Sequence, residues 1–234
     1  MKGLILFLGE SFRLGCQGTR NRGDPISYTE QIKACNSHIS FINNIHAYNN
    51  ADIKVYISTY TTQYDSKLLD IYKKYLIGYT IYDKLLGLQK LFRDTIQKVN
   101  LNYDLNYDFI LYIRVDLFLK DYFTTIFNPY MKEISYPSIC FIPHHKINEH
   151  PRVNDTMLFI PNKYFKYLNI LSIYHDSWFK AMSYLTYHDL GTMLYTYHDS
   201  DSEKDYNPIY YIVNRPQTDK FHSEGLIFNK FNLL

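Results

Sequence analysis

The sequence lacks the features that mark several large classes of protein. It has only three cysteines, at positions 16, 35 and 140, and no Cys-x-x-Cys spacing. Such a sparse, odd set argues against a disulfide framework and indicates a reducing compartment. No apolar run approaches the length that a transmembrane helix requires. The formal net charge is only +2, which gives no electrostatic basis for binding a nucleic-acid backbone.

The start of the sequence shows no secretory signal. The apolar run from Leu4 to Leu8 is short, is followed by Gly9 and Glu10, and has no small-residue cleavage site. Charged residues make up 21% of the chain and hydrophobic residues 46%, a balance typical of globular chains. We therefore expect a cytoplasmic protein that forms a single domain over residues 1–234.

Aromatic residues are abundant, with 25 tyrosines and 15 phenylalanines. One interpretation is nucleotide composition, because AT-rich coding favours Tyr, Phe, Ile, Asn and Lys. A second is functional, because an exposed tyrosine ring offers an apolar face and a polar tip to a sugar. The two interpretations are compatible, and the same rings are candidates for a homodimer interface.

Short apolar runs alternate with amphipathic segments through the first half of the chain. Ser27 and Glu30 have the spacing of a capping box, Asn49 and Asn50 end that helix, and Asp83 is placed to cap a later one. The expected strands are 3–8, 53–58, 76–81 and 109–113, and the expected helices are 27–49, 66–75 and the one that Asp83 caps. This order predicts a doubly wound, Rossmann-like α/β domain with a mixed, mainly parallel central sheet flanked by helices.

The pattern is less regular after residue 116. The expected strands there are 139–142, 155–160 and 209–213, and the expected helices are 163–171, 177–187 and one that begins at Asp189. No linker or repeat of fold-defining length interrupts the chain, which supports one domain.

The segment 109–113 is an almost unbroken apolar run that ends in Arg114 and Asp116. It is typical of a strand buried on both faces, and α/β sheets bind ligands at the carboxyl ends of such strands. Residues two apart in a strand share a face, so both charges are expected to point into one crevice. A strand-end carboxylate can hold Mg²⁺ or Mn²⁺, and an arginine can bind phosphate bidentately. The alternative is a salt bridge at the end of the strand.

A second candidate is the segment 9–25, which follows the first expected strand and contains four glycines and three arginines. Its glycines allow a ligand to approach the backbone closely, and Arg13, Arg20 and Arg22 have the charge to neutralise a diphosphate. The spacing matches neither the Rossmann glycine fingerprint nor a Walker sequence. The alternative is a solvated, flexible loop.

Two further candidates come from the second half. Asn154 and Asp155 enter an apolar strand, where polar groups without partners are costly. Asp155 is therefore a candidate general base or sugar ligand. The alternative is a turn residue at the start of a strand. His198 precedes an acidic stretch and is a candidate third ligand of a divalent metal. For this histidine, too, a purely structural role is the alternative.

Three segments together resemble a group of GT-A glycosyltransferases found in large DNA viruses and in bacterial capsule clusters. They are 9–13 (GESFR), 107–117 (YDFILYIRVDL) and 154–161 (NDTMLFIP). The likeness extends from the first strand to about Arg215. With the low-GC composition, it favours a giant-virus source.

The resemblance implies a hexosyl- or pentosyltransferase that moves a sugar from a nucleoside diphosphate sugar, with UDP favoured, to a glycan or glycoprotein hydroxyl. It implies a nucleotide-binding half, 1–116, and an acceptor-side half, 117–234. The residues implied to bind the donor are Gly9, Glu10, Arg13, Arg20 and Arg114. Asp155 is the candidate base if the reaction inverts the anomeric centre, whereas a retaining reaction requires no such base.

The resemblance also implies a divalent metal, Mn²⁺ or Mg²⁺, at Asp116, which matches the last residue of the usual Asp-x-Asp motif and would act in catalysis. Arg114 stands at the first position of that motif and can itself neutralise phosphate, which would make the ion weak or dispensable. Two other functions stay open. One is a nucleotidyltransferase, which usually needs two or three clustered acids, and the other is a non-catalytic glycan-binding module.

Overall fold

A computed structural model describes the chain in several stretches. The described residues are 1–15, 20–103, 106–121, 123–125, 127, 139–143, 153–162, 165, 191–194, 210–213 and 230–232.

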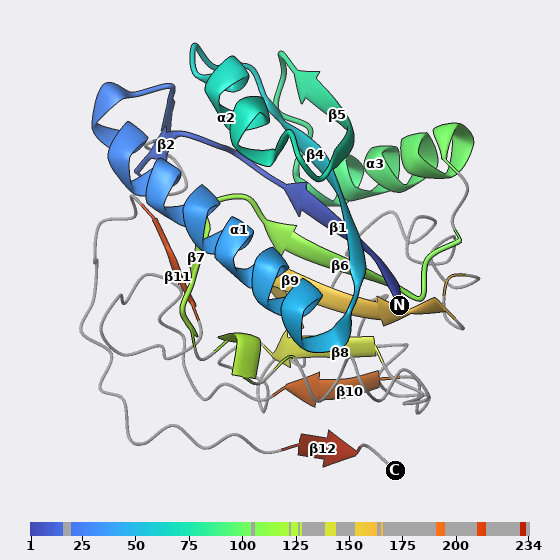
Figure 1. The fold of residues 1–234 in the computed structure, drawn as a ribbon. Helices are drawn as coiled ribbons and strands as arrows, with labels where there is room; N and C mark the ends of the chain where they lie inside the picture. Colours follow the sequence, from blue (N-terminus) through green and yellow to red (C-terminus); the bar gives the residue numbers. More distant parts are fainter. Residues whose placement is uncertain are drawn as a thin grey trace.

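The centre of the fold is an eight-stranded sheet with the strand order β12-β10-β8-β9-β6-β1-β4-β5 (Figure 1). The strands are β1 (Lys2–Leu8), β4 (Asp52–Tyr60), β5 (Leu76–Tyr82), β6 (Phe109–Arg114), β8 (Ile139–Pro143), β9 (Val153–Pro161), β10 (Gly191–Leu194) and β12 (Lys230–Asn232). Strands β5, β4, β1 and β6 pair in parallel, as do β8 and β10. Strand β9 runs antiparallel to both of its neighbours, and β12 is antiparallel to β10. The expected mixed, mainly parallel α/β sheet is confirmed.

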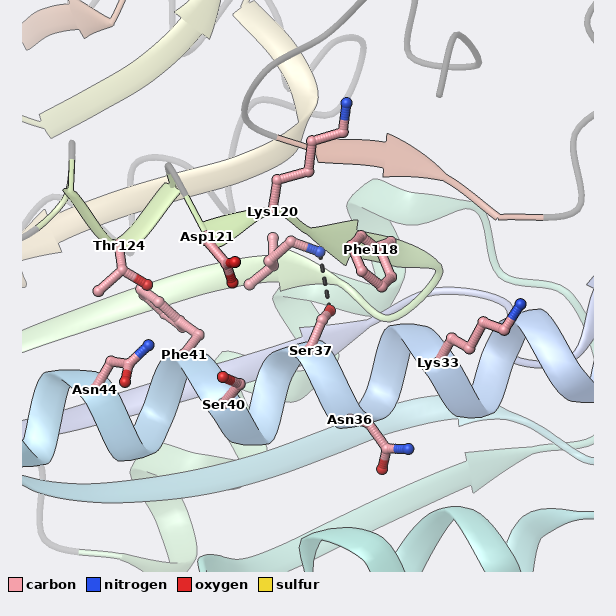
Figure 2. A pocket seen from close by; sticks show the side chains of 11 residues that line it. Lys33, Asn36, Ser37, Ser40, Phe41, Asn44, Phe118, Lys120, Asp121 and Thr124 are labelled. Atoms are coloured by element: carbon pink, nitrogen blue, oxygen red, sulfur yellow. Dashed lines mark hydrogen bonds between the residues drawn. The ribbon is translucent and has the colours of Figure 1, made fainter. Parts of the chain in front are cut away.

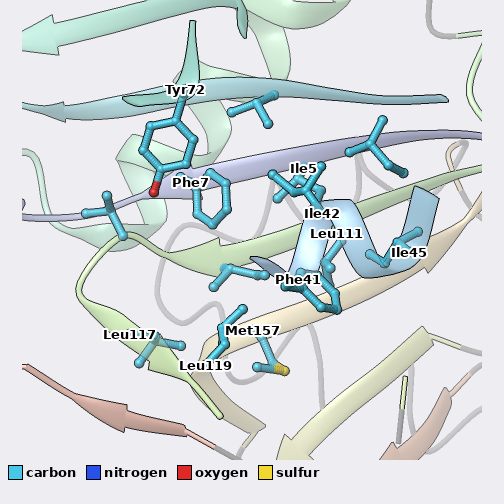
Figure 3. Close-up of a cluster of buried hydrophobic side chains, with 14 of the residues drawn as sticks. Ile5, Phe7, Phe41, Ile42, Ile45, Tyr72, Leu111, Leu117, Leu119 and Met157 are labelled. Atoms are coloured by element: carbon cyan, nitrogen blue, oxygen red, sulfur yellow. The ribbon is translucent and has the colours of Figure 1, made fainter. Parts of the chain in front are cut away.

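Helices cover both faces of the parallel half of the sheet (Figure 1). They are α1 (Tyr28–Asn49), α2 (Asp65–Tyr72) and α3 (Leu88–Asn102). Alternate residues of a strand point to opposite faces. Ile5 and Leu111 therefore pack in one core cluster with α1 and α2 (Figure 3), whereas Leu6 and Tyr112 pack in a second cluster with α3. Burial on both faces explains why these strands are continuous apolar runs.

The start of α1 differs from the prediction. Ser27 precedes the helix, but it makes no side-chain cap, and its hydroxyl donates to the Asp24 carbonyl at 2.7 Å. A turn of 3₁₀ helix (Pro25–Ser27) comes first and already holds Ser27 in the helical region, whereas a capping side chain requires an extended backbone. The capping box was therefore wrong, and Glu30 pairs instead with Lys33.

The end of α1 at Asn49 is confirmed, because Asn50 adopts the left-handed conformation at φ 47°. The cap of α3 was wrong: the helix starts after Gly87, which has φ 73°, and Asp83 instead accepts a 2.7 Å hydrogen bond from the Thr61 hydroxyl. The helix runs to Asn102.

Two further expectations need correction, at residues 191–194 and in the loop after β1. Residues 191–194 form β10 rather than a helix, because pairing with β8 and β12 overrides local propensity. The expected strand at 209–213 is confirmed as β11 (Tyr210–Ile212), which pairs with β7 (Leu117–Leu119) in a separate small sheet. The expected loop after β1 contains a short hairpin of β2 (Arg13–Leu14) and β3 (Asn21–Arg22).

The helices predicted at 163–171 and 177–187 fall outside the described residues, apart from residue 165. Among the helices that the structure describes, none is both long and apolar enough to span a membrane. The single-domain organisation stays a prediction.

Candidate functional site

The site is built where the carboxyl ends of β1, β4 and β6 meet. Parallel pairing places Leu8 beside both Ser58 and Arg114, so the segments that follow these strands leave the sheet at one edge. Gly9 is the first residue after β1, and its N–H donates to the Ser58 carbonyl at 3.1 Å. Its φ of 120° is a conformation that residues with side chains rarely adopt. Glycine therefore lets the chain turn sharply over the end of the sheet.

A cavity of about 320 Å³ opens at this edge. Its lining residues are Gly9, Glu10, Arg13, Arg20, Tyr60, Leu85, Gly87, Leu88, Leu91 and Arg114. One wall comes from the end of β4 and the start of α3 and is mainly apolar. The opposite wall comes from the β1 loop and β6 and is charged. All five residues predicted to bind a donor line this one cavity.

Glu10 is a buried acid between two of the arginines. Its Oε1 lies 2.7 Å from Arg20 Nη1 and 3.6 Å from Arg13 Nη1. The residue is 8% exposed, and its Oε2 is buried without a hydrogen-bond partner among the described atoms. Since leaving a buried carboxylate oxygen unpaired is costly, this atom is suited to accept a hydrogen bond from a ligand.

Asp116 lies at the centre of an ion-pair network. Arg114 donates to it through two nitrogens, Nε to Oδ1 at 2.9 Å and Nη2 to Oδ2 at 2.6 Å. Arg13 Nη2 donates to Oδ2 at 2.9 Å. Asp116 is 1% exposed and Arg114 7% exposed. The predicted shared crevice is thus only half right, because Arg114 lines the cavity while Asp116 is covered and binds guanidinium groups.

This arrangement does not fit the predicted metal. Both carboxylate oxygens of Asp116 face guanidinium donors, whereas Mg²⁺ and Mn²⁺ need several oxygen ligands. Within the described stretches, no three His, Cys, Asp or Glu residues gather as a metal site. His198 lies outside the described residues. The metal stays a prediction.

Asp155 can be placed only by its backbone. It belongs to β9, in which Met157 pairs with Ile113 at the end of β6. Because the two strands are antiparallel, Asp155, two residues before Met157, lies at the same edge of the sheet as Arg114. This position suits a group that meets an acceptor, and its role as a base stays a prediction.

The sequence did not single out the polar residues of α1 that contact this region. Gln31 and His38 are both fully buried. Gln31 bonds to the Val115 carbonyl at 2.8 Å, and His38 Nε2 to the Leu117 carbonyl at 2.6 Å. Burial lowers the pKa of His38 to about 3, so the imidazole is neutral: Nε2–H donates to Leu117, and Nδ1 accepts from the Tyr72 hydroxyl at 2.5 Å.

A second cavity, of about 330 Å³, lies between α1 and the chain that follows β7 (Figure 2). It is lined by Lys33, Asn36, Ser37, Ser40, Phe41, Asn44, Phe118, Leu119, Lys120, Asp121 and Thr124. None of the residues predicted for catalysis or donor binding is among them.

No protein-family model matches this sequence, and no curated protein sequence matches it. The structure does resemble solved proteins. TarS 1-349 from S. aureus superposes with a TM-score of 0.52 at 10% identity, over 91% of this chain and 60% of that one. A glycosyltransferase involved in glycosylating the major capsid of PBCV-1 aligns over 85% of this chain and 82% of its own, with a TM-score of 0.41 and 11% identity.

The 4-diphosphocytidyl-2C-methyl-D-erythritol synthase from Anaerococcus prevotii has a TM-score of 0.48 at 8% identity, over 83% of this chain and 87% of its own. The superposition on the TarS fragment shows a shared fold. The chain spans about 60% of the TarS fragment that it matches.

Proposed function

We propose that the protein is a glycosyltransferase that moves a sugar from a nucleoside diphosphate sugar to a hydroxyl of a glycan or glycoprotein. The observation that carries this proposal is the cavity at the carboxyl ends of β1, β4 and β6. One of its walls is apolar, and the other holds three arginines against the two acids Glu10 and Asp116. A net positive charge beside an apolar wall is complementary to a nucleoside diphosphate.

The apolar wall is the place for the nucleoside. Leu85, which is 50% exposed, and Leu88 present an apolar surface on which a base can pack. Glu10 Oε2, the buried oxygen without a partner among the described atoms, would accept a hydrogen bond from a ribose hydroxyl. Ribose is common to every nucleotide, so this contact does not choose the base, and UDP-sugars are the first donors to test.

The arginines are the place for the diphosphate. In sugar transfer the acceptor oxygen bonds to the anomeric carbon while the bond from that carbon to the diphosphate oxygen breaks, and the bonding electrons leave with the diphosphate. Arg114 and Arg20 line the cavity and would stabilise the charge that grows there, because guanidinium groups bind phosphate oxygens through paired hydrogen bonds. If the transfer inverts the anomeric centre, Asp155 would take the proton of the acceptor hydroxyl.

Thermal unfolding with UDP, GDP, CMP and their sugar conjugates, each with Mn²⁺ and with EDTA, tests the proposal. A nucleotide at a hundred times its dissociation constant stabilises by about 2.7 kcal/mol, which for a chain of this length is about 5 to 10 °C. A shift that persists in EDTA would support arginines rather than a metal as the diphosphate ligand. No shift with any nucleotide would refute the donor site. Pyrophosphate release from a nucleoside triphosphate would instead favour a nucleotidyltransferase.

A matched pair of variants locates the binding site. Arg20 Nη1 pairs with Glu10, and its side chain is 33% exposed; Arg93 pairs with Asp94 at 3.7 Å on α3, and its side chain is 29% exposed. We expect Arg20→Met to weaken nucleotide binding about tenfold or more, the scale of losing a charged hydrogen bond. Arg93→Met should change it less than twofold. Equal effects of the two variants would remove the cavity as the site.

A further inference from the structure

The backbone that carries Asp116 is held from two sides. On one side, β7 pairs with β11, and the Val213 N–H donates to the Asp116 carbonyl at 2.9 Å. The other side faces α1 (Figure 1). The Val115 carbonyl accepts a 2.8 Å hydrogen bond from Gln31 Nε2, and the Leu117 carbonyl accepts a 2.6 Å hydrogen bond from His38 Nε2.

The third contact on that side is the Leu119 N–H, which donates to the Ser37 hydroxyl at 2.9 Å (Figure 2). Residues 117 and 119 alternate in the strand β7, so their backbone polar groups point to the same edge. The Val115 carbonyl, in the turn before β7, is also bound by α1. The side chains of α1 thus take the place of a neighbouring strand. Asp116 lies between two of these anchored residues, and its carboxylate turns to the arginines.

Gln31 also contacts the segment that carries Arg13, the other member of the ion pair. Its Oε1 accepts a 3.1 Å hydrogen bond from the Phe12 N–H. Phe12 has φ 49° and is fully buried, and a bulky residue persists in this left-handed region only where its surroundings hold it. Arg13 follows directly. One amide side chain therefore ties together the loop of Arg13 and the turn of Asp116.

We propose that Gln31 is a positioning residue, which sets the Arg13–Asp116 ion pair and through it the charged wall of the cavity. Two buried hydrogen bonds, one to each neighbouring segment, fix the separation of residues that are 103 positions apart in sequence. Gln31 itself does not line the cavity among the residues that the structure describes. The role of this wall in donor binding rests on the function proposed above, whereas the geometry of the ion pair does not.

A double-mutant cycle on Arg13 and Asp116, measured once with Gln31 in place and once with Gln31→Met, tests the positioning role. Arg13→Met, Asp116→Asn and the double variant are unfolded by denaturant, and the ratio of unfolding constants gives the coupling between the two side chains. We expect a coupling of about tenfold or more in the native background, as for buried charged neighbours. With Gln31→Met added, which keeps the length of the side chain but removes both hydrogen bonds, the coupling should fall at least threefold.

Gln63→Met is the matched control, because Gln63 also donates to a backbone carbonyl, that of Gly23 at 3.0 Å, but at the surface. It should leave the coupling unchanged. An unchanged coupling in Gln31→Met would overturn the proposal. If Gln31→Met does not fold, Gln31→Glu replaces it: the ionised form still accepts from Phe12 but cannot donate to Val115, and a coupling equal to wild type would be equally decisive.

Calorimetric titration with UDP and GDP separates positioning from folding. A merely structural role lowers the fraction of protein that binds, whereas a positioning role raises the dissociation constant of the folded fraction. We expect Gln31→Met to raise that constant at least fivefold and Gln63→Met to leave it unchanged; equal constants in both variants would overturn the link to the cavity. If wild type binds no nucleotide, the proposed function fails, and the coupling measurement still decides whether Gln31 positions the ion pair.

Discussion

Asp116→Ala is expected to destabilise the fold strongly, because it removes the carboxylate that accepts three hydrogen bonds from two buried guanidinium groups. Arg13 is 4% exposed and Arg114 7% exposed, and three hydrogen bonds of 2.6 to 2.9 Å join them to this carboxylate. Removing one partner of a buried ion pair costs about 3 to 5 kcal/mol. For a chain of this length, that lowers Tm by about 6 to 20 °C.

Denaturant unfolding at pH 7 measures the loss as a change in midpoint at constant slope. Asp52→Ala is the control, because the side chain of Asp52 is 58% exposed and pairs with Lys54 at 3.1 Å at the surface, where such pairs contribute under about 1 kcal/mol. A loss below about 1 kcal/mol in Asp116→Ala would show that the carboxylate is not the centre of a buried network. Turnover corrected for the folded fraction should fall by about 100-fold or more, because Asp116 holds Arg114, which would stabilise the leaving diphosphate. Activity within twofold of wild type would show that this ion pair does not act in the reaction.

Three other predictions concern the core. Leu111→Ala, in the buried centre of β6, should lower the free energy of unfolding by about 2 to 5 kcal/mol. Leu101→Ala, at an 82% exposed position, should lower it by less than about 0.5 kcal/mol. Equal losses of the two variants in denaturant unfolding would contradict the assigned core. Because the pKa of His38 falls to about 3 on folding, the unfolded chain binds a proton that the native state does not. The free energy of unfolding should therefore fall as pH drops from about 6.5 toward 3, by about 2 kcal/mol at pH 5. Urea unfolding of His38→Gln should not show this part of the pH dependence. Burial raises the pKa of Cys35 to about 11, so iodoacetamide should label it, by peptide mass, only after unfolding; rapid labelling of the native protein would disprove its burial.

The polar residues of α1 show how a sequence pattern can be right in part. Apolar residues at three- and four-residue spacing predicted the helix correctly, and Cys35 and Ile42 do lie in its buried stripe. Gln31 and His38 lie in the same stripe, which is the signal that could have identified them. Two polar residues on an apolar face must find partners, because burying them unpaired is costly. Which partners they find depends on distant segments, among them Val115 after β6 and Leu117 in β7, which come more than 70 residues later.

The charged residues show the same limit. The composition of the segment after β1 and the end of β6 indicated a ligand site, and the structure brings Gly9, Glu10, Arg20 and Arg114 to one cavity. The apolar wall opposite was missed, because Tyr60 and Leu88 follow no motif. Tyr60 faces the cavity through the pairing of β4 with β1, and Leu88 through the packing of α3 against the sheet.

By itself, the sequence determined the elements whose signals are local. The apolar run of β6, the end of α1 at Asn49 and the turn at Gly9 depend on neighbouring residues, and these carry the same physical preferences in any fold. Only the tertiary structure decided that residues 191–194 form a strand and that the Asp116 carboxylate binds Arg13 rather than facing an open crevice. Strand pairing and buried ion pairs join residues far apart in the chain, and their free energy depends on burial, which no local pattern specifies.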